Sequence, residues 1–147
     1  MKHCLLVLTA TLVIFSLPQQ TFSRDDQLVF PIGDALSTPA AKDKLKGIDF
    51  YFGNQKHPQV LKDFGEFNTN KKTNAFNKSD KQACEWAFLS ALLQLQDRAR
   101  NLKANAVINI KSNYKHREYA SETEFECGAG HIMAGVALKG RIVKLAR

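Results

Sequence analysis

The chain has 147 residues, of which 44% are hydrophobic and 24% charged, and its formal net charge at pH 7 is +7. This length fits one domain with a hydrophobic core, and it excludes an enzyme that joins an ATPase domain to a DNA-binding module. The positive charge favours anionic partners at long range but does not specify a fold.

The N-terminus has the pattern of a secretory signal peptide. Lys2 and His3 form a short positive region, residues 5–17 form an apolar run, and small residues precede a cleavage site after Ser23. The run is 13 residues long, whereas a membrane-spanning helix needs about 20. We therefore expect residues 1–23 to be a cleaved signal peptide. Residues 24–147 are expected to form one domain without a transmembrane segment.

The cysteine count changes when the predicted signal peptide is removed. Cys4 is lost with it, and it precedes the apolar run, unlike the lipid-bearing cysteine of a lipoprotein. Cys84 and Cys127 remain, and an even pair in an exported chain predicts one structural disulfide between a helix and a sheet. This interpretation places the protein in the periplasm or outside the cell. A thiol nucleophile and a metal ligand are the alternative roles for these cysteines.

The first half of the mature chain predicts short elements. Pro39 suits the first turn of a helix, with Ser37 or Thr38 as its cap. An aromatic-rich strand ends at Gly53, and an asparagine- and lysine-rich loop follows a weaker strand. The expected elements are a strand at 28–32, a helix at 35–45, strands at 48–52 and 60–67, and a loop at 68–77.

A long amphipathic helix is the clearest prediction. Ser79 and Gln82 have the spacing of a capping box, and Asn105 suits the left-handed end of a helix. Trp86 and other apolar side chains widen the apolar stripe, so we expect the helix to be covered on more than one side. The stripe itself recurs at three- and four-residue steps: Cys84, Phe88, Ala91, Leu92, Leu95, Ala99 and Leu102.

The C-terminal third predicts strands. Residues 106–111 and 131–145 alternate with period two, the latter with a bend at Gly135 or Gly140. Residues 122–127 are expected to pair as a strand, and 114–121 to form a turn or an exposed hairpin. Small residues at 128–130 and 134–137 would let another backbone approach closely. The fold class is therefore α+β, with one long helix packed on a mainly antiparallel sheet and one disulfide.

Seven segments carry a resemblance to known proteins: residues 52–55 (FGNQ), 70–77 (NKKTNAFN), 84–87 (CEWA), 92–99 (LLQLQDRA), 104–110 (ANAVINI), 127–130 (CGAG) and 133–140 (MAGVALKG). Together they resemble a family of small exported bacterial proteins of unknown function, whose members often carry the label "excinuclease ATPase subunit". The resemblance covers nearly the whole mature chain and implies an exported protein.

The helix followed by the ANAVI strand is more distantly similar to two other families. These are the YbjQ-type heavy-metal-binding domain and the core of the outer-membrane Rcs stress-sensor lipoprotein. Those relatives usually have glycine where Lys103 stands, and the sensor has two bridges and a lipid anchor. The resemblance therefore implies metal binding as an alternative function, and a sensor role does not carry over.

The excinuclease label can be tested against the residues. A nucleotide-hydrolysing subunit needs a G-x-x-x-x-G-K-[ST] loop to hold phosphate and magnesium. The glycine pair Gly130 and Gly135 is followed by Val-Ala, and the pair Gly135 and Gly140 by Arg-Ile. Because both lack the lysine and the hydroxyl, we expect no nucleotide ligand and reject the label.

The donors for a metal site are scattered along the sequence. No two histidines are four residues apart, there is no C-x-x-C, and Cys127 with His131 is the only short pair. We expect no metal and no cofactor. The residues considered as ligands are His57, His116, His131, Cys84, Cys127 and Met133.

Catalytic patterns are equally weak. Cys127 beside His131 suggests a thiol nucleophile, but a cysteine with a single partner in an exported chain is usually bridged. The glutamates at 122, 124 and 126 alternate as on a solvated strand. We expect no catalytic residue, and a hydrolase would be indicated if a cleft gathered His57, His116 or His131 beside a carboxylate.

One segment favours ligand binding. Residues 68–81 combine lysines with aromatic and amide side chains, a composition that suits an anionic ligand. The candidate site consists of Lys71, Lys72, Phe76 and Lys78. The alternative is a solvated loop whose phenylalanines pack on the core. The sequence thus predicts a non-enzymatic binding or envelope accessory protein whose partner is an envelope component or an anionic ligand. The oligomeric state stays open.

Overall fold

The computed structural model describes residues 23–147, so the predicted signal peptide lies outside the described residues except for Ser23. This part of the chain forms three helices and seven strands. In order they are β1 (Asp26–Pro31), α1 (Ile32–Ser37), α2 (Pro39–Lys44), β2 (Asp49–Phe52), β3 (Val60–Asn74), α3 (Asp80–Asn101), β4 (Ala106–Tyr114), β5 (Arg117–Tyr119), β6 (Glu124–Ala129) and β7 (Met133–Leu145).

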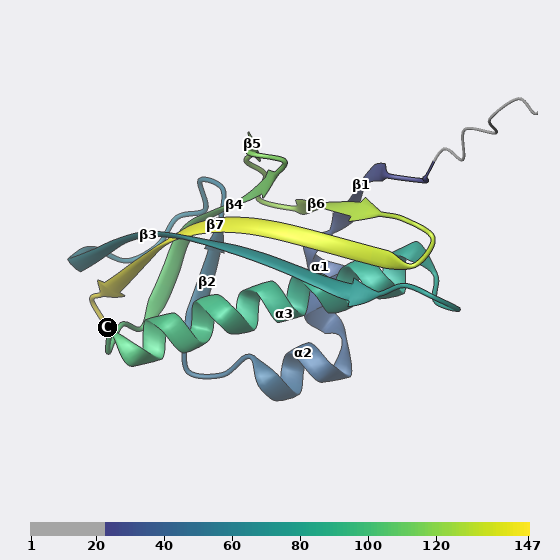
Figure 1. The fold of residues 1–147 in the computed structure, drawn as a ribbon. Helices are drawn as coiled ribbons and strands as arrows, with labels where there is room; N and C mark the ends of the chain where they lie inside the picture. Colours follow the sequence, from purple (N-terminus) through teal and green to yellow (C-terminus); the bar gives the residue numbers. More distant parts are fainter. Residues whose placement is uncertain (1–22) are drawn as a thin grey trace, which may run out of the picture.

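The strands form one sheet organised around β7. β3 pairs with β7 along almost its whole length, while β6 and β4 share the opposite edge of β7. All pairs are antiparallel except β2 with β4. Figure 1 shows α3 and α2 on one side of this sheet and the β4–β5 hairpin rising on the other. The predicted α+β class is confirmed.

The long helix α3 is stabilised as its sequence predicts. Ser79 Oγ accepts a hydrogen bond from the backbone N–H of Gln82 at 3.1 Å, and the predicted apolar stripe is buried apart from half-buried Leu102. Trp86 departs from the prediction, since 49% of it is exposed. The left-handed residue after the helix is Lys103, with φ 58°, and not Asn105. Glycine adopts this conformation without a clash of a Cβ atom, which explains why glycine would suit position 103, as in the families that the helix and the following strand resemble.

The core lies between α3 and the sheet. Phe88 of α3 stacks on Phe125 of β6, with ring centroids 4.1 Å apart. Next to them a disulfide joins Cys84 to Cys127, with a Cα–Cα distance of 5.8 Å, and both residues are fully buried. The predicted disulfide between helix and sheet is therefore confirmed.

Two predicted boundaries are wrong. Residues 68–74 continue β3 instead of forming a loop, because each of them pairs with a residue of β7. The helix expected at 35–45 is split in two at Thr38, whose hydroxyl caps α2 by accepting from Ala41 N at 3.3 Å. Gly140 marks a close approach of β4, since a Cβ there would lie 2.8 Å from Val107 Cγ1, and the register of β4 against β7 shifts at this point.

The sheet has two unlike faces. Along β6, Phe125 and Cys127 belong to the core under α3, whereas Glu126 and Gly128 alternate onto the other face. The helices cover only the first face, so the second is left to the strands and to the hairpin that folds over it. We call this second face the outer face.

Candidate functional site

A groove lies on the outer face, over the N-terminal half of β7. Its volume is about 1020 Å³. β3 forms one wall, the β4–β5 hairpin forms the other, and the β6–β7 turn and the first described residues border one end. Its lining includes Arg24, Asp25, Asn68, Asn70, Lys72, Asn113, Tyr114, Lys115, His116, Gly128, His131, Ile132, Met133, Gly135 and Ala137. We call this cavity the outer groove.

Small residues make the floor of the outer groove. A Cβ on Gly128 would lie 2.2 Å from the Tyr114 hydroxyl, so the phenol ring rests directly on the strand. A Cβ on Gly135 would lie 3.3 Å from Lys72 Cγ, which places the aliphatic stem of Lys72 across β7. The floor therefore carries almost no side chains, and those of Tyr114 and Lys72 lie over it.

Tyr114 is held in place by Asp25. Its hydroxyl donates to Asp25 Oδ1 at 2.8 Å, and Lys115 Nζ lies 2.6 Å from the other carboxylate oxygen. Burial, reinforced by this hydrogen bond, raises the pKa of Tyr114, and the ammonium of Lys115 lowers the pKa of Asp25. Asp25 is thus ionised and compensated, and Tyr114 stays a neutral phenol at the groove.

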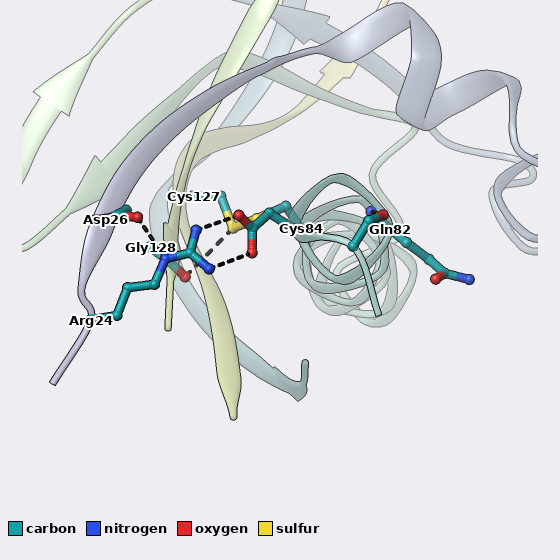
Figure 2. A network of polar contacts seen from close by, with 8 residues as sticks. Arg24, Asp26, Gln82, Cys84, Cys127 and Gly128 are labelled. Carbon is teal, nitrogen blue, oxygen red and sulfur yellow. Dashed lines mark hydrogen bonds and ion pairs between the residues drawn. A yellow bond between two sulfur atoms is a disulfide. The ribbon is translucent and has the colours of Figure 1, made fainter. Parts of the chain in front are cut away.

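Arg24 ties the start of the domain to the first turn of α3. Its guanidinium forms a two-point ion pair with Asp80 and lies 2.6 Å from Asp26, which raises the pKa of Arg24. Figure 2 shows this network beside the Cys84–Cys127 disulfide. Although Arg24 lines the groove, its charge is already balanced by two carboxylates.

The hairpin over the groove turns at Lys115 and His116. Both have positive φ, 50° and 62°, as the two central residues of a type I′ turn require. Asparagine and glycine are preferred there, so two long side chains in this conformation are unusual. They place an ammonium and an imidazole at the rim of the groove.

Several polar groups of the groove have no partner within the described part of the chain. Lys72 makes neither an ion pair nor a hydrogen bond, and the same holds for the side-chain amides of Asn68, Asn70 and Asn113. Lys72 therefore supplies an uncompensated positive charge, and the amides supply both donors and acceptors. This combination suits a small anionic molecule that also carries hydroxyl or amide groups.

A charged ladder occupies the outer face beyond the groove. Lys139 of β7 lies 2.9 Å from Glu66 of β3 and 2.8 Å from Glu118 of β5, and Lys111 lies 2.6 Å from Glu118. The two lysines lower the pKa of Glu118 to about 2. These charges compensate one another, in contrast to Lys72.

The four residues predicted to bind an anion do not share one loop. Lys71 and Lys72 are neighbours in a strand and therefore lie on opposite sheet faces, Lys71 beside α3 and Lys72 in the groove. Phe76 and Lys78 lie in the turn after β3. Of the two phenylalanines in the alternative interpretation, Phe67 packs against the core, while Phe76 is 62% exposed. The predicted loop is therefore divided between a strand and a turn, and its binding of an anion stays a prediction.

The histidines and the cysteines fall in three places. His116 and His131 line the groove with Asp25, while His57 packs against Tyr51 away from it. In the described residues no hydrogen bond joins a histidine to a carboxylate, and the disulfide occupies both sulfurs. Nor do three His, Cys, Asp or Glu side chains of residues 23–147 gather as they would around a metal ion.

Sequence reasoning missed most of the groove. Asn68, Asn70 and Lys72 alternate with period two, a signal that a strand assignment for 68–74 would have revealed. Tyr114 over Gly128 joins positions distant in the sequence, and nothing local indicates it. The small residues at 128–130 and 134–137 predict a close approach of another backbone, and in the structure they form the floor of the groove.

Comparisons with known proteins find no match, whether against models of protein families, curated proteins or solved structures. No helix among residues 23–147 has the length and apolar character to cross a membrane. We therefore infer the function from the residues of the site itself.

Proposed function

We propose that the protein is a periplasmic or secreted binding protein without catalytic activity, and that a small organic anion occupies the outer groove. The observation that carries this proposal is the uncompensated Lys72 beside three unpartnered asparagine amides over a glycine floor. Ligand sites are typically concave, with a few polar groups that fix the orientation of the ligand.

The compartment is supported by two independent features. A buried disulfide persists in an oxidising compartment, and the N-terminal sequence has the pattern of a signal peptide. The resemblance to exported bacterial proteins agrees with this location. The label of an ATPase subunit does not fit the fold, because the segment from Gly130 to Gly135 leads into an antiparallel strand and not into a helix.

The absence of catalysis is proposed on the arrangement of the titratable groups. Asp25 is engaged by Tyr114 and Lys115, and the histidines at the groove have neither a hydroxyl nor a carboxylate partner among the described residues. General acid–base or nucleophilic catalysis needs such pairs within hydrogen-bond reach. The groups present can bind and orient a ligand.

Titration of the isotope-labelled protein with glucuronate and with glucose tests the proposal. The two sugars differ in one carboxylate, so binding through Lys72 predicts backbone amide shifts around 68–72 and 128–137 for glucuronate only. Inorganic phosphate and citrate extend the panel of anions. The variant Lys72→Met should lose the response, and Lys62→Met, on the same strand outside the groove, should keep it.

Two results would contradict the proposal. The first is an equal response to the neutral sugar, or no response to any anion of the panel. The second is chemical conversion of the bound sugar, which mass spectrometry of the recovered ligand would detect. The metal-binding alternative is tested by native mass spectrometry, where a stoichiometric metal together with free thiols would replace this proposal.

A further inference from the structure

Large apolar side chains are exposed where two turns meet at one end of the sheet. Phe76 is 62%, Ile132 65% and Met133 49% exposed. Phe76 lies in the turn between β3 and α3, while Ile132 and Met133 belong to the β6–β7 turn and the start of β7. In Figure 1 both turns lie at the right-hand end of the sheet. We call these three residues the apolar tip.

Backbone hydrogen bonds hold the two turns together. Ala75 N donates to Ile132 O at 2.8 Å, and Asn74 is paired with Met133 in the sheet. Each turn is also closed internally, by Lys78 N to Ala75 O at 3.1 Å and by Gly130 N to Met133 O at 2.9 Å. The exposure of the apolar tip is therefore a feature of ordered backbone.

Apolar residues are unusual at such corners. Turns favour glycine, proline, asparagine, aspartate and serine, which adopt the required backbone angles or bond to the backbone with their side chains. Phe76 and Ile132 do neither. Contiguous exposed apolar side chains mark interaction sites. Three side chains are too few for a stable protein interface, which takes about 20 residues or more on each side. Three projecting side chains are enough, however, to insert into a soft surface such as a lipid bilayer.

Uncompensated lysines surround the apolar tip. Lys71 and Lys72 lie near the end of β3 and Lys78 lies two residues after Phe76, and none of them forms an ion pair among the described residues. The carboxylates of this region are compensated, because Asp80 pairs with Arg24 and Asp34 with Lys81. An apolar projection with a cationic border has the chemistry of a segment that inserts between anionic lipid headgroups.

We infer that the apolar tip docks the protein on the surface of a phospholipid bilayer with anionic headgroups. Phe76, Ile132 and Met133 enter the boundary between headgroups and acyl chains, and the lysines lie at the phosphates. The apolar tip adjoins the outer groove, whose lining includes Ile132, Met133 and Lys72, but membrane docking also depends on Phe76 and Lys78, which do not line the groove. Failure of one proposal leaves the other standing.

Flotation of the purified protein with lipid vesicles tests the inference. Binding is expected to vesicles of phosphatidylglycerol and phosphatidylethanolamine in equal parts, and not to vesicles of phosphatidylcholine. The variant Phe76→Ser/Ile132→Ser should lower the partition coefficient at least tenfold. Its matched control is Leu61→Ser/Trp86→Ser, which removes side chains that are 60% and 49% exposed elsewhere, and this variant should bind normally.

The electrostatic part is tested with variants of equal net charge. Lys71→Gln/Lys78→Gln should weaken binding by more than tenfold, because each lysine near an anionic surface contributes about fivefold. Lys103→Gln/Lys144→Gln removes the same charge from the cleft at the opposite end of β7 and should have little effect. Equal losses in both variants would show that net charge alone drives binding and would overturn the inference.

A relocated tryptophan reports the inserted residue directly, since Trp86 is the single tryptophan of the chain. Phe76→Trp/Trp86→Phe should show a blue-shifted emission with anionic vesicles, and Leu61→Trp/Trp86→Phe should not. Binding of the serine variant at the wild-type level, equal binding to phosphatidylcholine, or a dimer that this variant converts to monomer would each overturn the inference. Thermal melting of every variant confirms that it is folded.

Discussion

The two faces of the sheet are built from alternate residues of the same strands, yet they have opposite characters. On the helix-covered face Phe88 and Phe125 stack beside a buried disulfide, and α3 excludes water. On the outer face Lys72 and Gly128 line a groove, ion pairs lie beyond it, and the apolar contacts form only a small second cluster around Val143. The larger hydrophobic core lies on the helix-covered face, so we expect substitutions there to lower the stability more than substitutions on the outer face.

The comparison is sharpest at β6, where neighbouring residues serve different purposes. Cys127 is bonded to α3, while the next residue, Gly128, lies under Tyr114 on the outer face. A substitution of Cys127 should therefore affect the core and the stability of the fold, whereas a substitution of Gly128 should affect the outer groove.

Removal of the disulfide is expected to have the largest effect on stability. The bridge closes a sequence separation of 43 residues, and the chain-entropy model gives it about 4 kcal/mol. Cys84→Ala/Cys127→Ala should lower the free energy of unfolding by roughly this amount in urea titrations. The same variant should keep the response of the outer groove to anions, since the groove faces away from the bridge. If reduction of the wild-type protein leaves the unfolding transition unchanged, the structural role of the bridge is refuted.

Substitution of one glycine on each face by alanine compares how strongly the two faces resist an added methyl group. Gly140→Ala places a Cβ 2.8 Å from Val107 Cγ1 in the core, where overpacking costs about 3 kcal/mol. Gly128→Ala meets Tyr114 instead, whose ring can swing away toward solvent, so a loss of about 1 kcal/mol is expected. Chemical denaturation measures both.

The same pair of variants has a second readout. When the ring of Tyr114 leaves the strand, it is less buried and loses Asp25, so the pKa of its phenol should fall toward the ordinary value, as carbon NMR of labelled tyrosines would show. Gly33→Ala is the control, because a Cβ there meets nothing within 4 Å. Equal losses at Gly128 and Gly140 would contradict the contrast between the faces.

The smallest effect concerns the charged ladder of the outer face. The pKa of Glu118 is lowered to about 2 from an ordinary value of 4.5, so its stabilisation is present above pH 4.5 and is lost as the pH falls toward 2. Glu118→Gln should therefore flatten the dependence of the melting temperature on pH in this window. Glu122→Gln, on the neighbouring exposed segment, is the control and should leave the curve unchanged.

The sequence by itself determined the features that depend on local chemistry. The apolar period and Ser79 define α3, the cysteine pair defines the bridge, and the alternation of 106–111 and 131–145 defines strands. The helix and strand patterns can each be recognised within a short stretch of sequence. The bridge follows from the fact that only two cysteines remain after the predicted signal peptide is removed. The α+β class followed from them.

Only the tertiary structure decided what lies on the outer face. Residues 68–74 have the composition of a loop, and they extend β3 because β7 offers a partner for every one of them. That pairing places Lys71 and Lys72 on opposite faces and joins the turn of Phe76 to the β6–β7 turn. The pairing of β4 and β6 with β7 brings Tyr114 onto Gly128. The physical reason is that strand pairing acts between segments far apart in the chain, so its register cannot be read from either segment alone.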